Sequence, residues 1–366
     1  MSPNADHKAD IAIVGAGMAG ASLAAVLVSG GARVLVLEAE HAPGYHATGR
    51  SAAFWTESYG GPGVQPLTTA SGPALRAGNY LTPRGALTIA RAGQEADLSA
   101  FADRYAALGV RVERMGRDRI AALVPRLRAA WSTGVFEPDC CDIDVARLHQ
   151  DCIAVANRGR ASFWTSARVV VAERLAAGWR LQLQDGRSAE AGILVNAAGA
   201  WADQLAAAAR VAPVGITPYR RTVAQLAMQA TPPASLPLVL DLKESFYFKP
   251  QAGRLWLSPH DETPSLPCDA AAEELDVAVA VDRLEGVVDW KVKRVEHRWA
   301  GLRSFAPDRL PVYGFAPGDP RFFWFAGQGG FGIQTAPAAA ALAGALLLGE
   351  PPSAVDPAPY SPGRFT

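Results

Sequence analysis

The chain has 366 residues, of which 49% are hydrophobic, and this length suffices for about two domains with buried cores. Lysine plus arginine and aspartate plus glutamate number 35 each, and this balance gives no support to a nucleic-acid binder or to a protein that binds an anionic membrane surface. The four cysteines include no Cys-x-x-Cys pair and the six histidines have no metal-ligand spacing. We therefore expect no metal site and free thiols in a reducing cytoplasm.

The first forty residues predict a strand, a glycine-rich turn, a helix and a second strand. Hydrophobic runs place these elements at residues 11–14, 19–29 and 33–37. Gly15, Gly17 and Gly20 form G-x-G-x-x-G, and Glu38 ends the second strand. The glycines permit a tight turn, close approach of the backbone to a pyrophosphate and helix packing, while an acid at Glu38 accepts ribose hydroxyls. The pattern indicates a dinucleotide but leaves its identity open.

A long glycine-rich loop follows at residues 41–63, and long ordered loops in compact domains are often functional. The pattern beyond it predicts a series of short elements: strand 84–90, helices 96–108 and 117–123, strand 134–138, and helix 144–157 with Asp144 as its N-cap.

The second half of the chain predicts mostly strands. Residues 162–190 alternate like an antiparallel meander, and a buried strand at 193–195 leads through small residues into a helix. Residues 217–305 predict antiparallel sheet with one helix at 271–284. Strand 321–326, a glycine-rich turn and a buried helix at 336–348 are expected to return to the nucleotide-binding domain. No run of about 18 apolar residues occurs, so we expect no transmembrane helix.

Several segments carry a resemblance to a known family: GAGMAGAS, PGYHATGRSAA, CDIDVARLHQ, LVNAAGAWAD, ESFYFKP, EHRWAGLRSF and QGGFGIQT. In this order they resemble the FAD-dependent amine and amino-acid oxidoreductases, which include D-amino-acid dehydrogenases, glycine oxidase and sarcosine oxidase. The likeness is greatest to bacterial D-arginine dehydrogenase. It implies FAD and hydride transfer from the substrate Cα to flavin N5. Some relatives tether the flavin through a cysteine near AGLRSF, and since this stretch has none we expect noncovalent FAD.

The resemblance and the element order together predict an α/β protein with two interleaved domains. The Rossmann-like FAD-binding domain is expected to take residues 1–85, 134–213 and 306–366. An α+β substrate domain, built on a mainly antiparallel sheet, is expected to take residues 86–133 and 214–305.

The resemblance makes Arg303 the first candidate for the substrate carboxylate, and a guanidinium suits that role because it can form a bidentate pair with a carboxylate. The resemblance adds Arg221 and Tyr247 at the same carboxylate and makes Tyr59 part of a mobile lid. The residues themselves leave alternatives open. Arg220 alternates with Arg221, so either side chain could point inward, and Tyr247 could simply belong to the core.

The resemblance also implies a set of cofactor contacts made by small residues and glycine turns. Besides the residues of the first turn and Glu38, these are Met18, Ala19, Ala39, Ala47, Thr48, Gly49, Arg50, Ser51, Ala52, Ala53, Phe54, Val170, Ala198, Gly199, Gly329, Gly330, Gly332, Ile333 and Gln334. Gln334 is in addition a candidate catalytic residue. The N–H groups of the glycine turn before the last helix could stabilise negative charge on reduced flavin, although a plain tight turn is the alternative.

Two positions depart from the arginine-preferring relative. Ala86 stands where that enzyme has an acid for a cationic side chain, and Phe54 stands where it has a histidine near the flavin. We therefore expect oxidation of an amino acid with a neutral side chain, first of all a D-amino acid, to an imino acid that hydrolyses to a 2-oxo acid and ammonia.

The alternatives are oxidation of glycine, N-methyl or cyclic secondary amino acids, an NAD(P)-dependent dehydrogenase, and an accessory FAD-binding subunit of a larger complex. The electron acceptor, oxygen or a quinone-like compound, stays open, as do the chirality of the substrate, the oligomeric state and peripheral association with the inner membrane.

Overall fold

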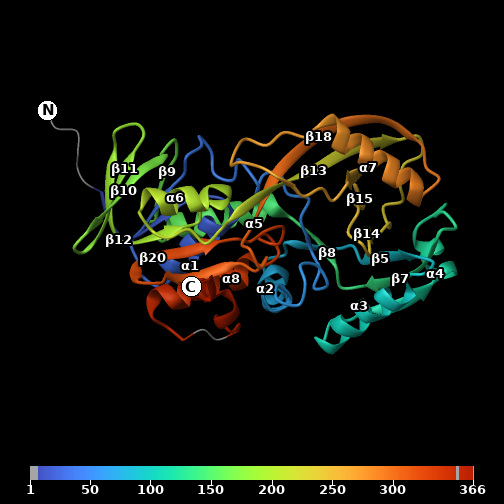
Figure 1. Cartoon of the computed structure of the whole chain (residues 1–366), viewed down its shortest axis with the longest axis horizontal. Helices are drawn as coiled ribbons and strands as arrows, with labels where there is room; N and C mark the ends of the chain where they lie inside the picture. Colours follow the sequence, from blue (N-terminus) through green and yellow to red (C-terminus); the bar gives the residue numbers. More distant parts are fainter. Residues whose placement is uncertain (1–6, 352–353, 366) are drawn as a thin grey trace.

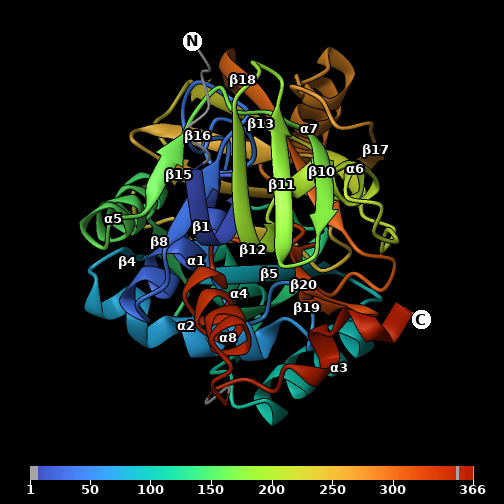
Figure 2. The same cartoon turned by 90° about the vertical axis from the view of Figure 1, so that its left-hand side faces the viewer.

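The computed structural model describes residues 7–351 and 354–365, and two sheets organise its two halves (Figure 1). The first sheet runs in the order β10 (Val169–Leu175), β11 (Gly178–Leu183), β12 (Ser188–Asn196), β1 (His7–Val14), β2 (Val34–Leu37) and β9 (Ser162–Trp164), with β20 (Asp319–Ala326) and β19 (Val312–Ala316) joined to the end of β12. Figure 2 shows β10, β11 and β12 side by side with β1.

The centre of this sheet is parallel: β1 pairs with β12 and β2, and β12 pairs with β20. Val34–Leu37 is entirely apolar and buried, as expected of a parallel strand covered on both faces. The surrounding helices are α1 (Met18–Ser29), α2 (Gln65–Ala77), α5 (Val145–Arg158), α6 (Ala202–Ala208) and α8 (Ala336–Leu348), with short 3₁₀ turns at Gly199–Trp201, Ala358–Tyr360 and Pro362–Phe365. Both α5 and α8 pack against α1. The predicted Rossmann-like layer is thus confirmed.

The second sheet is almost entirely antiparallel. Its order is β17 (Thr263–Pro264), β13 (Thr217–Met228), β16 (Arg254–Ser258), β15 (Tyr247–Gln251), β14 (Leu238–Asp241), β5 (Ala86–Arg91), β7 (Trp131–Glu137) and β6 (Glu113–Gly116), with β18 (Val292–Phe305) along β13. The helices of this half are α3 (Glu95–Ala107), α4 (Arg117–Leu123) and α7 (Glu274–Val287). A small sheet of β3 (Phe54–Trp55), β8 (Cys141–Ile143) and β4 (Leu81–Pro83) completes the fold.

Three sequence expectations need correction. The expected domain boundary between residues 133 and 134 would cut β7, which pairs with β5 and β6 in the second sheet, so the chain through Glu137 lies with that sheet. Residues 162–190 are not one meander, because β9 is a separate strand that pairs in parallel with β2. The helix expected at 271–284 begins three residues later, since Glu273 has an extended backbone and serves as N-cap.

Other local expectations hold. Asp144 caps α5 by accepting a hydrogen bond from the backbone N–H of Arg147 at 3.0 Å. At Gly20 an added Cβ would lie 1.8 Å from the carbonyl oxygen of Gly15, so only glycine lets α1 approach the turn this closely. Among residues 7–351 and 354–365, no helix combines the length and the apolarity that crossing a membrane requires.

Candidate active site

A cavity of about 500 Å³ lies between the two halves and is lined from β1 to the turn before α8. It brings together nearly all the residues expected at the site, with two exceptions. Gly20 lies beneath the first turn, and Gly49 donates its N–H to the Gly44 carbonyl at 2.8 Å inside the loop. Both therefore shape the wall of the cavity from behind.

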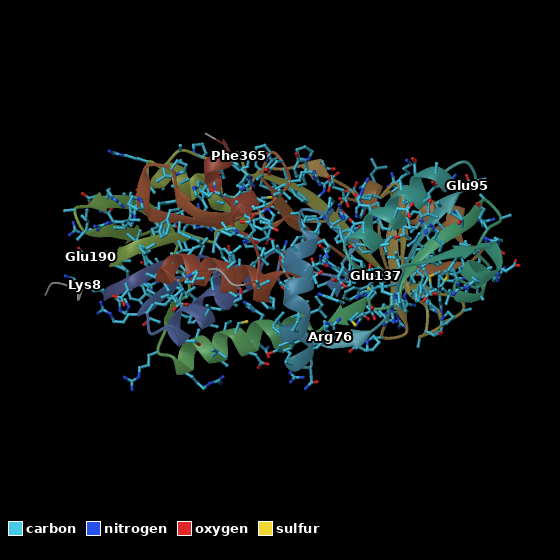
Figure 3. All side chains as sticks on the ribbon, turned by 90° about the horizontal axis from the view of Figure 1, so that it is seen from below. Lys8, Arg76, Glu95, Glu137, Glu190 and Phe365 are labelled. Atoms are coloured by element: carbon cyan, nitrogen blue, oxygen red, sulfur yellow. The ribbon has the colours of Figure 1, made fainter. Side chains whose placement is uncertain are left out.

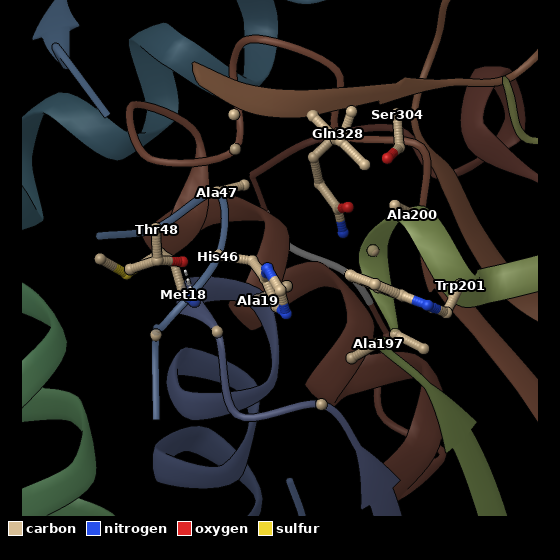
Figure 4. A pocket seen from close by; sticks show the side chains of 18 of the residues that line it. Met18, Ala19, His46, Ala47, Thr48, Ala197, Ala200, Trp201, Ser304 and Gln328 are labelled. Atoms are coloured by element: carbon tan, nitrogen blue, oxygen red, sulfur yellow. Dashed lines mark hydrogen bonds between the residues drawn. The ribbon is translucent and has the colours of Figure 1, made fainter. Parts of the chain in front are cut away.

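Glu38 is held by the glycine turn that it faces. Its Oε2 accepts the N–H of Ala16 at 2.8 Å, and its Oε1 accepts the N–H of Glu40 at 2.9 Å. A carboxylate has about four lone-pair sites, so acceptor capacity remains for ribose hydroxyls at this end of the cavity. At the start of α1, the Met18 N–H bonds Thr48 Oγ1 at 2.9 Å, which ties the loop to the turn (Figure 4).

Three further residues at this end were missed by the sequence analysis. His149, on α5, bonds the Ala16 carbonyl through Nε2 at 2.9 Å, and burial lowers the pKa of its ring, so a neutral imidazole donates this bond. His46 and Trp201 line the cavity with ring centroids 4.7 Å apart (Figure 4). All three lie in segments that carried the family resemblance, which was the only sequence signal for them.

Arg50 was expected to contact the cofactor, but its guanidinium bonds mainly to other residues of the protein. Nη1 donates to the carbonyls of Ala270 at 2.7 Å and Ala300 at 3.1 Å, and Nη2 pairs with Asp269. Arg50 therefore anchors the loop at 41–63 to the second half, while it still lines the cavity.

At the other end, the pairing of β13 with β18 sets which arginines face the cavity. Tyr219 lies opposite Arg303, so Arg221, two residues along β13, is on the same face as Arg303. Both arginines line the cavity and are buried. Arg220 points the other way and pairs with Glu273 and Asp276, which resolves the open alternative in favour of Arg221.

The Arg303 guanidinium packs against Gly330 and is surrounded by aromatic rings. A Cβ at Gly330 would come within 2.0 Å of Arg303 Nη2, so a larger residue here would displace the guanidinium from its present position. Arg303 lies 5.2 Å from the Phe305 ring and 5.7 Å from the Phe331 ring, and Nη2 donates to the Tyr59 hydroxyl at 3.0 Å. Burial lowers the pKa of Arg303, although a guanidinium stays charged in proteins.

An apolar wall closes this end of the cavity. Tyr247, Phe54 and Val223 line it, and they pack in one buried cluster with Ala86 and Leu238, which lie behind them. Burial raises the pKa of Tyr247, so its hydroxyl stays protonated and can donate a hydrogen bond.

The segment that carries Tyr59 is anchored from both halves of the protein. On the second sheet, the buried Glu137 accepts the Thr56 hydroxyl at 2.6 Å and the N–H groups of Glu57 at 2.7 Å and Ser58 at 3.2 Å. The buried Glu137 side chain lies near the junction of the two halves (Figure 3). From the cofactor side, Gln334 Nε2 donates to the Tyr59 carbonyl at 3.3 Å. Gln334 is thus used to hold this segment.

His260 extends the chain of contacts behind Tyr59. The Tyr59 hydroxyl lies 3.4 Å from His260 Nε2, and His260 is buried against the Tyr247 ring. Burial, reinforced by Arg221 and Arg303, lowers the pKa of His260 to about 2. The neutral ring therefore accepts a hydrogen bond from Tyr59 while Tyr59 accepts one from Arg303.

Glu137→Gln should destabilise the protein by about 2 kcal/mol, the value of a hydrogen bond to a charged group. Fixed backbone N–H groups face both carboxyl oxygens, so the amide NH₂ of glutamine would oppose a donor. Urea unfolding measures the loss, and limited proteolysis should show faster cleavage near Tyr59. Glu57→Gln, in the same segment, is the control. Equal unfolding free energies for wild type and Glu137→Gln would contradict this role.

His260→Asn should reduce the sensitivity of the protein to acid. His260 must stay neutral when folded but titrates near pH 6.5 when unfolded, so its contribution to stability falls as the pH drops below 6.5. Between pH 6.5 and 5 the wild type should lose roughly 1.5 kcal/mol more unfolding free energy than the variant. Asparagine tolerates the positive φ of 55° at this position. Parallel pH profiles for the two proteins would show that His260 is not held neutral.

Comparison with known proteins gives concordant results. A protein family described as FAD dependent oxidoreductase matches residues 10–346. The glycine oxidase of Pseudomonas aeruginosa PAO1 is 30% identical over 174 residues, which is 46% of this chain and 45% of that enzyme, so the match spans less than half of the relative.

Solved structures match over nearly the whole fold. Glycine oxidase from Geobacillus kaustophilus superposes with a TM-score of 0.85 at 23% identity, covering 97% of this chain and 98% of that chain. L-Proline dehydrogenase from P. horikoshii gives 0.86 at 18% identity, covering 98% of each chain. L-Amino acid deaminase from Proteus vulgaris gives 0.84 at 17%, covering 100% of this chain and 99% of that one.

Proposed function

The chain belongs to the FAD-dependent oxidoreductase family, and we propose that it oxidatively deaminates an amino acid with a neutral side chain, first of all a D-amino acid. The observation that carries the proposal is the buried pair Arg303 and Arg221 on one face of the β13–β18 ladder, at the far end of the cavity from the glycine turn. A paired guanidinium site suits a carboxylate, and the apolar wall beside it suits an uncharged side chain.

The residues of the elongated cavity fit FAD. At Gly15 an added Cβ would lie 2.3 Å from the Ala197 carbonyl oxygen, so only glycine fits there, and at Gly17 it would make a tight contact of 3.2 Å with Thr48 Oγ1. The start of α1 and Glu38 would hold the pyrophosphate and the ribose. Residues 300–305 contain no cysteine, which supports noncovalent binding.

FAD bound in this cavity would supply the acceptor for a hydride from the substrate Cα. The side chains of the protein would hold the substrate in position. Arg303 has five N–H donors, and its described bonds to Tyr59 and Glu262 use two of them. With Arg221 and the neutral hydroxyl of Tyr247, it would fix the substrate carboxylate and thereby aim the Cα–H bond.

The amine must be neutral for its carbon to release a hydride. His260, with a pKa of about 2, is too weak a base to take the ammonium proton near neutral pH. We therefore infer that the substrate reacts from its free-amine form, and that the surrounding apolar wall favours this uncharged state.

Oxidation of glycine or of a cyclic or N-methyl amino acid is the second candidate. The 30% identity to glycine oxidase over part of the chain supports it, as does the likeness in fold to L-proline dehydrogenase. All these substrates share a carboxylate and an adjacent amine, so the arginine pair serves either candidate.

Anaerobic flavin bleaching across D-, L- and N-methyl amino acids tests the proposal. Neutral D-amino acids should reduce the bound flavin fastest, and D-arginine and D-lysine should be slow, because Ala86 offers no counter-charge. Admission of air then times reoxidation and separates an oxidase from a dehydrogenase. Fastest reduction by D-arginine would refute the side-chain assignment, and no bleaching by any amino acid would favour an accessory subunit.

Arg303→Lys should lower kcat/KM by about 100-fold or more, since lysine keeps the charge but loses the fork that orients a carboxylate. Arg220→Lys is the matched control, because Arg220 is next to Arg221 on the opposite face and pairs with Glu273. It should leave kcat/KM within about twofold, the range of a substitution away from the site. Near-normal kinetics in Arg303→Lys would remove this arginine from the mechanism.

A further inference from the structure

A carboxylate of the protein itself bridges the arginines of the proposed site. Glu262 Oε1 lies 3.3 Å from Arg221 Nη2, 3.2 Å from Arg303 Nη1 and 2.7 Å from Arg309 Nη2. Glu262 is not among the residues that line the cavity, so it contacts the arginine pair from behind. One oxygen is thus shared by three guanidinium groups.

The backbone on both sides of Glu262 is fixed to strand β13. Asp261, just before it, accepts the N–H of Thr222 at 2.7 Å and its hydroxyl at 3.0 Å. Thr263 and Pro264, just after it, form β17 and pair with Arg220 and Tyr219. Glu262 is therefore anchored to the strand that carries Arg221, and its carboxylate stays beside the arginines.

This arrangement limits the charge presented to a ligand. The three arginines carry three positive charges, while Glu262 and Asp261, which lies 3.8 Å from Arg221, carry two negative ones. One net positive charge remains in the cluster, which a single bound carboxylate would neutralise. Substrate and product of the proposed reaction each carry a carboxylate, so two unopposed arginines would also retain the product.

We propose that Glu262 is a positioning residue that orients Arg221 and Arg303 and weakens their hold on carboxylates, so that substrate binds and the 2-oxo acid leaves. This inference rests on the proposed function, because it assumes that the arginine pair binds a carboxylate. Loss of the Glu262 charge should tighten carboxylate binding, whereas a residue with only a structural role would weaken binding when replaced.

The test is calorimetric titration of the FAD-loaded protein with acetate, a carboxylate without an amine. Glu262→Gln should bind acetate about tenfold more tightly, as expected when a negative charge beside a charge-paired site is removed. Glu273→Gln makes the same change in net charge on the opposite face, where it pairs with Arg220, and should leave the Kd within about twofold. Unchanged or weaker acetate binding in Glu262→Gln would overturn the inference.

Two further variants keep the result interpretable. Arg309→Gln removes the exposed partner of Glu262 and should weaken acetate binding, which is the opposite sign and does not require Glu262 to be replaced. Unchanged or tighter acetate binding in this variant also counts against the inference. Arg303→Lys tests the premise: if it leaves the acetate Kd unchanged, the proposed carboxylate site fails. If Arg303→Lys weakens binding and Glu262→Gln does not tighten it, only the role of Glu262 fails.

Discussion

The pairing of β13 with β18 is the constraint on which the site depends. The two strands pair from Thr217 opposite Phe305 to Met228 opposite Val292, and this register sets the direction of every side chain along them. A slip of one residue would turn Arg303 away from the cavity, because side chains alternate between the two faces. The glycine turn before α8 is tied to the same ladder, since Gly329 donates its N–H to the Ser304 carbonyl at 2.8 Å.

Local patterns in the sequence predicted many of the turns, caps and helices, because these features depend on interactions between residues that are close together in the chain. The first turn, the cap at Asp144 and helix α4 depend on residues a few positions apart, and each was found as expected. The course of the chain between the sheets was harder to predict. β7 mixes apolar and polar residues and would suit either sheet, and only its pairing with β5 and β6 decides between them.

The residues of the candidate site likewise include some that the sequence predicted and others that only the fold reveals. Arg303 stood out because its segment carried the family resemblance and a guanidinium can form a bidentate pair with a carboxylate, whereas Arg220 and Arg221 were equivalent until helix α7 supplied Asp276 as the partner of Arg220. The sequence carried no signal for Glu137 or Glu262, since their partners lie about 80 and 40 residues away along the chain. The close contact at Gly330 likewise involves a residue distant in the chain, Arg303.

The two anchors of the Tyr59 segment have a kinetic consequence. Thr56 to Ser58 are bonded to Glu137 in one half and Tyr59 to Gln334 in the other, so displacing this stretch breaks contacts with both halves in a single event. Gly60 and Gly61 follow directly with φ of 101° and 84°, and they are bound by neither anchor. Bending therefore concentrates at these glycines, and we expect movement of Tyr59 to be a collective loop motion of microseconds or longer rather than the flip of one side chain.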